Sequence, residues 1–374
     1  MSLGNPHREG WSPNITALTM TTPTNGPLTR TVLTHEVLNM TTGMEGVQVI
    51  SLSLGYVMGQ ALHAAAELGV ADALTHGPRT VAEIAAETGT HEPSMRRLLR
   101  TLASGGVFTE TDPDRFGLTP LSETLRRGTA GSVRDAVIWV GEPMHYATCG
   151  DLTATVKAGT PAFDRLFHRP YFDALAADPD AARVWDRGMA CFSSMENAPI
   201  AHAYDFPTGT RVVDIGGGQG GFLAEVLSTD PTLCGVLFDL DDVVNNPREL
   251  EDAGLLDRCK LVSGNFFESL PSGGDLYVFK RVMHDWDDNT CIKLLQLCRD
   301  VIPADGRLLI VDAVIPPGND PHPAKIVDIV MMGVLGGRER TEAEFSQLLY
   351  TAGFTLNRII PTHSMLAIVE ALPA

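Results

Sequence analysis

The C-terminal half of the chain alternates short apolar runs with stretches of helical periodicity. Helical patterns such as Phe222–Leu227 and Asn289–Ile302 separate the apolar runs that follow Asp205. Five runs have the length and composition of strands: Arg211–Ile215, Gly235–Leu240, Lys260–Ser263, Asp275–Val282 and Arg307–Ile315. Strands that alternate with helices form a parallel sheet with helices on both faces, so an α/β domain is predicted from residue 205 onward.

The end of this domain departs from the alternation. After a predicted helix over Thr341–Ala352, two β-type runs, Thr355–Pro361 and Met365–Leu372, are separated by only three residues. A connection this short suits an antiparallel hairpin, because a parallel pair needs a crossover of about a dozen residues or more. We therefore expect a mostly parallel, seven-stranded sheet with an antiparallel C-terminal hairpin.

The region before residue 130 has the pattern of a winged helix. Thr80–Gly89 and Glu92–Ala103 are predicted helices, and Val107–Thr109 and Arg115–Thr119 are predicted strands. Winged helices often bind DNA, but residues 47–130 hold seven Lys or Arg against nine Asp or Glu, so they lack a basic footprint. A dimerisation and substrate-lid scaffold is favoured, and a ligand-sensing regulator is the alternative.

An uncharged stretch, Val47–Ala66, is as long as a membrane span but contains several polar residues. We predict a buried helix in place of a membrane helix. A helix that is apolar on every side needs cover on every side, and a second copy of the chain would provide that cover. The pattern therefore predicts a homodimer that does not enter the membrane.

Composition narrows the class of protein further. The chain has 374 residues, and 46 acidic residues against 28 basic ones give a net charge of −18, which disfavours nucleic acid and anionic membranes as partners. Its six cysteines are irregularly spaced and include no C-x-x-C pair, so reduced thiols and a cytoplasmic location are expected. The first ~45 residues lack a signal-peptide pattern and are predicted to be a flexible arm.

A glycine-rich loop follows the first predicted strand of the α/β domain. Gly216-x-Gly218-x-x-Gly221 matches the dinucleotide fingerprint, and Asp239, at the end of the next strand, suits the hydroxyls of an adenosine ribose. A nicotinamide or a sulfonium cofactor would both use these residues. Asp214 immediately before the loop would repel a pyrophosphate, and the chain ends in a hairpin instead of a second mononucleotide half. A cationic ligand without phosphate is therefore favoured.

Five motifs in order resemble those of S-adenosylmethionine-dependent small-molecule O-methyltransferases, both the plant phenylpropanoid enzymes and the bacterial natural-product tailoring enzymes. The resemblance runs from about Gly46 to the C-terminus. It implies S-adenosylmethionine as cofactor, S-adenosylhomocysteine as product, a Rossmann-like catalytic domain and a homodimer. The motifs are Asp214–Gly220, Phe238–Leu240, Gly264–Phe267, Phe279–Trp286 and Gly336–Thr341.

The resemblance also implies which residues contact the cofactor. Gly216 would contact the methionine part, Asp239 the ribose, and Asn265 and Phe266 the adenine, where many relatives have Asp in place of Asn265. Lys280 would contact the cofactor from the fourth strand, and Trp286 would cover the adenine face. The full predicted set is Asp214, Gly216, Gly218, Asp239, Leu240, Asn265, Phe266, Lys280 and Trp286.

Methyl transfer to a phenol-type hydroxyl is faster when a base removes the proton. His284 follows the fourth strand, at the carboxyl edge of the sheet, and resembles the family's base. Glu339 and Asp312 match the positions that flank it, although relatives commonly have Glu where this chain has Asp312. Asp285 adjoins the base, and a helix-capping or solvated role is at least as well supported for it as a catalytic one. The run of acidic residues after His284 is not predicted to bind a metal.

Two apolar stretches match the family's substrate-facing residues, although such stripes are usually core. They comprise Trp185, Met189, Phe192, Met331, Met332 and Leu335. Four segments are thus predicted: an arm (1–45), a helical winged-helix-like dimerisation domain (46–150), a helical linker that contributes to the substrate pocket (151–204) and the cofactor-binding catalytic domain (205–374).

The predicted function is methylation of a hydroxyl on an aromatic or polyketide-like small molecule, in secondary metabolism. The alternatives are a hydroxylase or decarboxylase on the same scaffold, a non-catalytic ligand sensor and a nicotinamide dehydrogenase.

Overall fold

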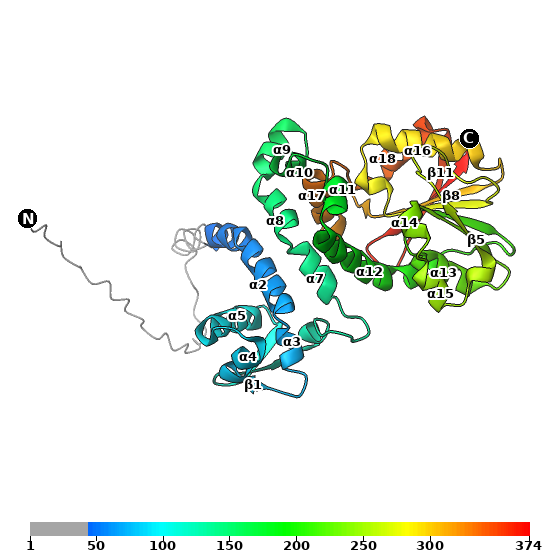
Figure 1. Ribbon diagram of the computed structural model, residues 1–374. Coiled ribbons are helices and arrows are strands. Elements are labelled where there is room, and N and C mark those ends of the chain that lie inside the picture. The colour runs from blue at the N-terminus through cyan, green and yellow to red at the C-terminus, as the bar shows by residue number, and fades with distance from the viewer. Residues whose placement is uncertain (1–43) are drawn as a thin grey trace, which may run out of the picture. The chain divides into compact units, whose positions relative to one another are not determined.

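The structure, a computed structural model, describes residues 44–374 (Figure 1). It divides into two units, residues 1–55 and 56–374, which are treated separately below. The flexible arm predicted for the first ~45 residues lies almost entirely outside the described residues.

The catalytic domain is built on a seven-stranded sheet with the order β11-β12-β8-β7-β4-β5-β6 (Figure 1). The five strands from β6 to β8 are parallel, and β12 runs antiparallel to both β8 and β11. The predicted α/β class and the C-terminal hairpin are confirmed. The strands are β4 Arg211–Ile215, β5 Cys234–Asp239, β6 Cys259–Ser263, β7 Leu276–Lys280, β8 Arg307–Asp312, β11 Phe354–Pro361 and β12 Ala367–Pro373.

Helices cover both faces of this sheet. Because neighbouring residues of a strand point to opposite faces, Val213 joins a core with α16 (Asp288–Val301) and α18 (Glu342–Thr351), and Val212 joins a core with α13 (Gly221–Thr229). Figure 1 shows α16 and α18 on one side of the sheet and α13 on the other. The remaining crossover elements are α14 Asp241–Val244, α15 Arg248–Asp252, η1 Leu256–Arg258 and η2 Met283–Asp285.

The predicted strand Arg307–Ile315 is divided in two. The β12 partner ends opposite Asp312, and Val314–Ile315 forms a separate strand, β9, parallel to β10 (Arg340–Thr341). This small sheet fixes Glu339, directly before β10, close to the chain that leaves β8. The division of the strand therefore serves to position a candidate catalytic residue.

A helical layer packs beside the catalytic domain, and all of its helices except α17 precede the sheet in the chain. Within it, α12 packs against α7 and α13, and α17, inserted between β9 and β10, packs against α8, α9 and α10. The helices are α7 Arg134–Val140, α8 Pro143–Gly150, α9 Leu152–Ala158, α10 Ala162–Phe167, α11 Tyr171–Ala177, α12 Pro179–Ala201 and α17 Pro323–Val334.

The predicted winged helix is present. Thr80 and Glu83 form the predicted capping box at the start of α4, and β1, β3 and β2 form an antiparallel three-stranded sheet. Leu99 and Phe116 are fully buried in the core of this module. Its elements are α3 Val70–Ala73, β1 Arg79–Thr80, α4 Val81–Thr88, α5 Glu92–Ser104, β2 Phe108–Asp112, β3 Arg115–Leu118 and α6 Pro120–Glu123.

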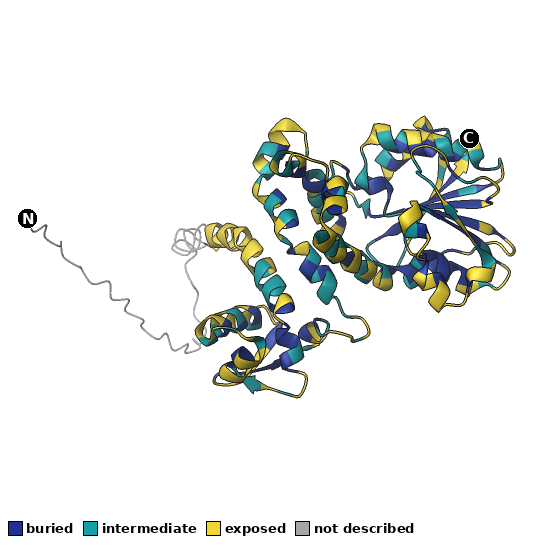
Figure 2. Ribbon diagram, viewed as in Figure 1, coloured by how far each residue is buried: buried dark blue, intermediate teal, exposed yellow. Residues whose placement is uncertain are grey.

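The predicted buried helix over Val47–Ala66 is helical but is not buried in the single chain. In α2 (Gly55–Glu67) only Ala65 and Ala66 are buried, and residues 44–57 are exposed (Figure 2). Met44–Glu67 is long and apolar enough to cross a membrane by length and composition alone. One chain provides cover only at the C-terminal end of the helix, so the predicted burial requires the second copy of the chain. The exposed apolar side chains are Met44, Val47, Val49, Ile50, Leu52, Leu54, Tyr56 and Val57.

Candidate active site

His284 lies just beyond β7, at the carboxyl edge of the sheet. The chain leaves β7 through Arg281, whose φ of 54° is in the left-handed region, and enters the short helix η2 that carries His284. The backbone N–H of Arg281 donates to the Val311 carbonyl at 3.0 Å. This turn fixes the start of the catalytic segment against β8.

A buried carboxylate orients the imidazole. His284 is 5% exposed, and its Nδ1 lies 2.8 Å from Oε1 of Glu339, which is 1% exposed. Nδ1–H therefore donates a hydrogen bond to the carboxylate, and in the neutral tautomer Nε2 is left as the acceptor. The arrangement matches the dyad expected of a general base.

Gly336-Gly337 allows Glu339 to approach the base this closely. The N–H of Arg338 donates to the His284 carbonyl at 2.9 Å, and the N–H of Glu339 donates to Asp328 at 3.0 Å. A Cβ atom on Gly337 would overlap the backbone of His284 and Asp285. Only glycine permits this contact between the two loops.

Asp285 faces the other side of the imidazole. Its Oδ1 lies 3.4 Å from Nε2 of His284, and its side chain is one-fifth exposed. The helix-capping role belongs to Asp287, which accepts from the N–H of Thr290 at the start of α16. Asp285 therefore does not cap α16, and its catalytic role stays a prediction. Burial raises the pKa of Asp285 to about 6, against the lowering effect of His284 and Arg281.

Asp312 lies at the end of β8 and is fully buried, but it makes no hydrogen bond to His284. Neither of its carboxylate oxygens has a protein partner. Burial raises the pKa of Asp312 to about 7, while the charge of His284 lowers it. Of the two predicted flanking carboxylates, only Glu339 is hydrogen-bonded to His284, and Asp312 acts on the imidazole through its charge.

Three carboxylates control the charge on His284. Burial lowers its pKa, but Asp285, Asp312 and Glu339 outweigh burial and raise the pKa to about 9. In the free protein at neutral pH the ring is therefore an imidazolium. A cation bound nearby would oppose this charge and favour the neutral base.

The glycine loop after β4 is open at Gly218, where a Cβ atom would meet nothing within 4 Å, and tightly packed at Gly217. Gly216, Gly218 and Gly220 all have positive φ, and a Cβ atom on Gly217 would lie 2.6 Å from Oδ2 of Asp214. Asp214 is 1% exposed and this Oδ2 atom has no protein partner. Burial raises the pKa of Asp214 to about 7, and Lys280 lowers it. An unpartnered buried carboxyl fits the ammonium or sulfonium end of a cationic cofactor.

Asp239 connects the glycine loop to β5. Its Oδ2 accepts from the N–H of Gly218 at 2.8 Å and its Oδ1 from the N–H of Leu240 at 2.7 Å. These bonds hold the carboxylate at the strand end, where its remaining lone pairs can accept the two hydroxyls of a ribose. The position suits the predicted cofactor contact.

Three other residues with predicted cofactor contacts have protein partners. Asn265 accepts from the N–H of Phe267 at 3.0 Å and donates to Glu268 at 3.2 Å, an Asx turn that shapes this loop. The ammonium of Lys280 lies 3.7 Å from Oε2 of Glu196. The ring of Phe266 packs beside Gly216, 3.6 Å from where a Cβ atom would lie.

Aromatic rings connect the catalytic segment to the helical layer. Trp286 stacks on Phe172 with ring centres 6.1 Å apart and meets the edge of Phe267 at 4.8 Å. Phe172 in turn meets Trp185 of α12 at 6.2 Å. Trp286 thus contacts Phe267, the neighbour of the predicted Phe266.

The predicted acceptor residues lie on α12 and at the C-terminal end of α17. Trp185 and Leu335 belong to one apolar cluster with Val334, and Met331 of α17 is buried. Met189, Phe192 and Met332 are half-buried. On α12, Phe192 packs edge-on against Trp139 at 5.9 Å. The structure thus brings Trp185 and Leu335 into one cluster, and the acceptor role of the whole set stays a prediction.

Sequence patterns did not indicate several aromatic residues of this layer. Trp139 donates through its indole N–H to the hydroxyl of Tyr171 at 3.2 Å, and its ring lies 4.6 Å from that of His145. Burial, helped by the charges of Glu142 and Asp285, raises the pKa of Tyr171 to about 12. These residues are scattered over α7, α8 and α11, so only the tertiary structure brings them together.

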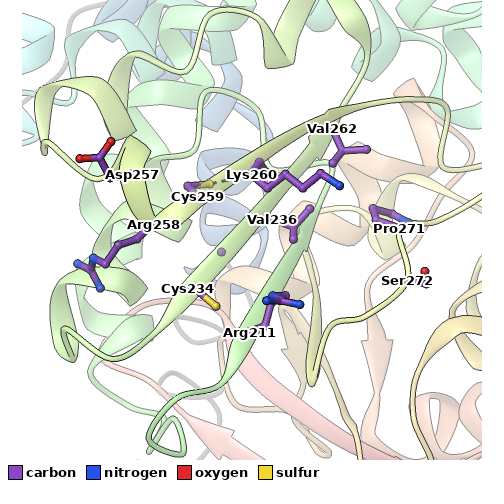
Figure 3. Close-up of a pocket in the computed structure, with 11 residues that line it drawn as sticks. Arg211, Cys234, Val236, Asp257, Arg258, Cys259, Lys260, Val262, Pro271 and Ser272 are labelled. Atoms are coloured by element: carbon purple, nitrogen blue, oxygen red, sulfur yellow. Dashed lines mark hydrogen bonds between the residues drawn. The ribbon is translucent and has the colours of Figure 1, made fainter.

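A surface pocket of about 420 Å³ lies at the amino ends of the parallel strands, opposite the carboxyl ends that carry the candidate active site (Figure 3). It is lined at the amino ends of β4, β5 and β6 by residues that include Arg211, Cys234 and Lys260. His284 follows the carboxyl end of β7, so this pocket is separate from the candidate active site.

Comparison with known proteins identifies two family domains. The chain matches the O-methyltransferase domain over residues 149–355 and the O-methyltransferase dimerisation domain over residues 50–128. The second match supports the predicted homodimer. It also includes most of the exposed apolar helix, which explains why that helix lacks cover in one chain.

Similar proteins act in natural-product pathways. The phenazine O-methyltransferase PhzM of Lysobacter antibioticus is 42% identical over 326 residues, which cover 87% of this chain and 95% of that protein. The mitomycin biosynthesis 6-O-methyltransferase of Streptomyces lavendulae is 38% identical, covering 81% of this chain and 87% of that protein.

A solved relative has the cofactor product bound. The structure of CalO1, a methyltransferase in calicheamicin biosynthesis in its S-adenosylhomocysteine-bound form, is 37% identical with a TM-score of 0.81, covering 88% of this chain and 98% of that one. The predicted hydroxylase, decarboxylase and sensor alternatives gain no support from these matches. The chain therefore belongs to the family of S-adenosylmethionine-dependent O-methyltransferases.

Proposed function

We propose that this enzyme methylates a phenol-type hydroxyl of a planar aromatic natural-product intermediate, with His284 as the general base. The observation that carries the proposal is the buried pair formed by His284 Nδ1 and Glu339 Oε1, 2.8 Å apart, at the carboxyl edge of the sheet. This edge also holds the glycine loop and its unpartnered Asp214 oxygen. A base and a cofactor cradle at one edge suit direct transfer between two bound molecules.

The residues of the cradle define how the cofactor would be held. Asp239 would accept the ribose hydroxyls, and Asp214 would face the positively charged part of the ligand. The backbone of Gly216 and Gly218 would line the methionine moiety, with Phe266, Asn265 and Trp286 on the adenine side. When bound, S-adenosylmethionine supplies an electrophilic methyl group.

Proton transfer is the task of the catalytic segment. Nε2 of His284 accepts the hydroxyl proton as the oxygen forms its bond to the methyl group, and the proton stays on the imidazole until it exchanges with solvent. Glu339 stabilises the resulting imidazolium through Nδ1–H. Asp285, 3.4 Å from Nε2, stabilises the same cation from the other side.

The neutral ring needed for this step is supported by charge balance. Three carboxylates raise the pKa of His284 to about 9 in the free protein. A sulfonium cation in the cradle adds a positive charge close to the ring, which lowers that pKa toward neutrality. The base therefore becomes competent when the methyl donor is in place.

The walls of the acceptor site support an aromatic molecule. Trp185, Phe172 and Trp286 form a connected array of rings beside His284, and Met331, Met332 and Leu335 provide an adaptable apolar surface. Trp185, Met189 and Phe192 would form one wall. The similar enzymes named for phenazine and mitomycin methylation are consistent with this class of acceptor.

Domain boundaries and location complete the proposal. We place the dimerisation domain at residues 46–150, the linker that contributes to the acceptor site at 151–204 and the cofactor-binding domain at 205–374. The cytoplasm, where the methyl donor is made and thiols stay reduced, is the expected compartment.

A panel of hydroxylated aromatic molecules tests the function. Each is incubated with enzyme and S-adenosylmethionine, and products are analysed by mass spectrometry for a gain of about 14 mass units per transferred methyl group. We expect O-methylated products from polycyclic phenols, with none from the His284→Ala variant over the same time. Methylation of matched aromatic amines but of no phenol would contradict the proposal.

A further inference from the structure

One buried ion pair joins the proposed acceptor wall to the segment that carries the base. Arg281 Nε lies 2.8 Å from Oε2 of Glu196, and Nη2 lies 2.5 Å from Oε1. The side chain of Glu196 is 4% exposed and that of Arg281 is 17% exposed. A bidentate pair with so little solvent fixes both distance and angle between its partners.

Arg281 occupies a backbone conformation that tertiary contacts must impose. Its φ of 54° lies in the left-handed region, which non-glycine residues rarely adopt. Within residues 44–374 only Asp114 and His168 share this feature, and neither belongs to the catalytic segment. Such strain is retained where the surrounding structure over-determines the position of a residue, often beside an active site.

Glu196 belongs to the same face of α12 as the predicted acceptor residues. Trp185, Met189, Phe192 and Glu196 are spaced at i, i+4, i+7 and i+11, which places them along one side of a helix. The guanidinium of Arg281 also lies 5.5 Å from the ring centre of Phe192. Arg281 therefore contacts both the polar end and an aromatic member of this stripe.

We propose that Arg281, held by Glu196, is a positioning residue that sets the register between the acceptor wall on α12 and His284. This inference rests on the proposed function. The acceptor oxygen must lie within reach of Nε2 and in line with the methyl group, but the wall and the base come from elements far apart in sequence. Apolar and methionine surfaces can slide over one another, whereas a bidentate ion pair cannot.

The shape of the guanidinium, and not its charge alone, explains why arginine is needed at this position. Lys280 already places an ammonium 3.7 Å from Glu196, so neutralisation of the carboxylate does not require a second cation. Arg281 adds a rigid fork and lowers the pKa of Asp285 beside the base. Lysine at position 281 would keep the positive charge and lose the fork.

The test compares Arg281→Lys and Glu196→Gln with Arg358→Lys. Arg358 also makes a bidentate pair, with both distances to buried Glu370 at 3.1 Å, but it lies on β11 at the far edge of the sheet. We measure kcat, the acceptor KM, calorimetric affinity for S-adenosylhomocysteine and the melting temperature. Arg281→Lys should lower kcat/KM by about 10²-fold, the effect of a misplaced reactant.

Both kcat and KM for the acceptor should change, because the wall and the base lose their register together. Affinity for S-adenosylhomocysteine should stay within about twofold, and Arg358→Lys should lower only the melting temperature. Glu196→Gln, which also removes the carboxylate that faces Lys280, should reproduce the kinetic loss. The double variant should be little worse than Glu196→Gln alone, since Arg281→Lys removes part of the same set of contacts. If Arg281→Lys does not fold, Glu196→Gln still gives the kinetic comparison.

Two outcomes have different meanings. If wild-type enzyme methylates a phenol and both Arg281→Lys and Glu196→Gln retain its kcat and acceptor KM, the positioning role is wrong and the proposed function stands. If wild-type enzyme binds S-adenosylhomocysteine but methylates no phenol, the proposed function fails and this inference fails with it.

Discussion

At the scale of single residues, the catalytic centre combines one imidazole with three carboxylates of different surroundings. Glu339 is hydrogen-bonded to the ring, Asp285 faces Nε2, and Asp312 is buried without a partner. Together the three carboxylates raise the pKa of His284. Because each lies in a different position, we expect substitution of each to affect the enzyme differently.

Removal of the base should affect chemistry more than binding. His284→Ala should lower turnover by about 10²–10⁴-fold while affinity for S-adenosylhomocysteine changes little, because the ring acts on the acceptor proton. Glu339→Gln should act in the same direction but less severely, and the double variant should fall little below His284→Ala. Raising the pH should partly rescue His284→Ala, as a phenol begins to ionise unaided. Wild-type turnover in His284→Ala, with chemistry rate-limiting, would contradict the mechanism.

The charge on His284 should appear in the pH dependence of cofactor binding. Its folded pKa of about 9 exceeds the ordinary value of 6.5, so the free protein carries the imidazolium at neutral pH and loses it as the pH rises through about 9. It repels a sulfonium, so affinity for S-adenosylmethionine relative to neutral-sulfur S-adenosylhomocysteine should increase between pH 6.5 and 8.5. Calorimetry with both ligands measures this ratio, and His284→Gln is the control. A ratio that changes equally in His284→Gln would assign the effect to other groups.

The same sign applies to stability without ligand. The ion pairs of His284 stabilise the fold fully below about pH 6.5, and this contribution is lost as the pH rises through about 9. Denaturant titrations of wild type and His284→Gln should therefore converge toward alkaline pH. Curves that stay parallel from pH 6.5 to 9.5 would contradict the raised pKa.

Asp239 provides a test of the cofactor cradle. Asp239→Ala should weaken S-adenosylhomocysteine binding by about 1.5–3 kcal/mol, the value of hydrogen bonds to a charged group. Calorimetry measures the change in affinity. Because Gly218 of the glycine loop donates a hydrogen bond to Asp239, circular dichroism checks that the substitution leaves the fold intact. Unchanged affinity would remove Asp239 from the site.

At the scale of elements, the short β9–β10 pair and the Gly336-Gly337 turn bring Glu339 to the base. Gly337→Ala should lower turnover at least as much as Glu339→Gln, because a Cβ atom cannot fit against the backbone of His284. Gly150→Ala is the matched control, since nothing lies within 4 Å of a Cβ atom there and its φ is not positive. Turnover and melting temperature are measured for both variants and compared with those of the wild type. Full activity in Gly337→Ala would show that the turn does not position Glu339.

At the scale of the whole molecule, the exposed apolar helix is the feature that one chain leaves incomplete. Leu52 is 75% exposed, and we expect Leu52→Lys to weaken the homodimer because it places a charge in an apolar contact. Tyr350→Lys, at a residue that is 78% exposed on α18, should leave the dimer intact. Light scattering measures both. A wild-type mass near 40.2 kDa at micromolar concentration would contradict the dimer.

Local patterns were sufficient for most of the fold. The strand runs from β4 to β8, the C-terminal hairpin and the capping box at Thr80 follow from neighbouring residues, since strand periodicity and helix capping depend on short stretches of chain. The glycine loop and His284 were recognised for a related reason. Their motifs consist of residues that are close together in the sequence, so they can be identified without knowledge of distant contacts. The apolar pattern of helix 47–66 indicated that cover is needed, and the structure shows that one chain does not supply it.

Tertiary structure alone decided how distant residues share the site. The family resemblance marked Glu339 and Asp312 as flanks of the base, with Asp312 one methylene shorter than the Glu common in relatives. The structure bonds only Glu339 to the imidazole, because the Gly336-Gly337 turn lies against the backbone of His284. It likewise paired Arg281 with Glu196, 85 residues apart, and Trp139 with Tyr171. The physical reason is that these contacts join residues far apart in the sequence. The spacing of residues along the chain predicts local structure and does not predict which distant side chains meet.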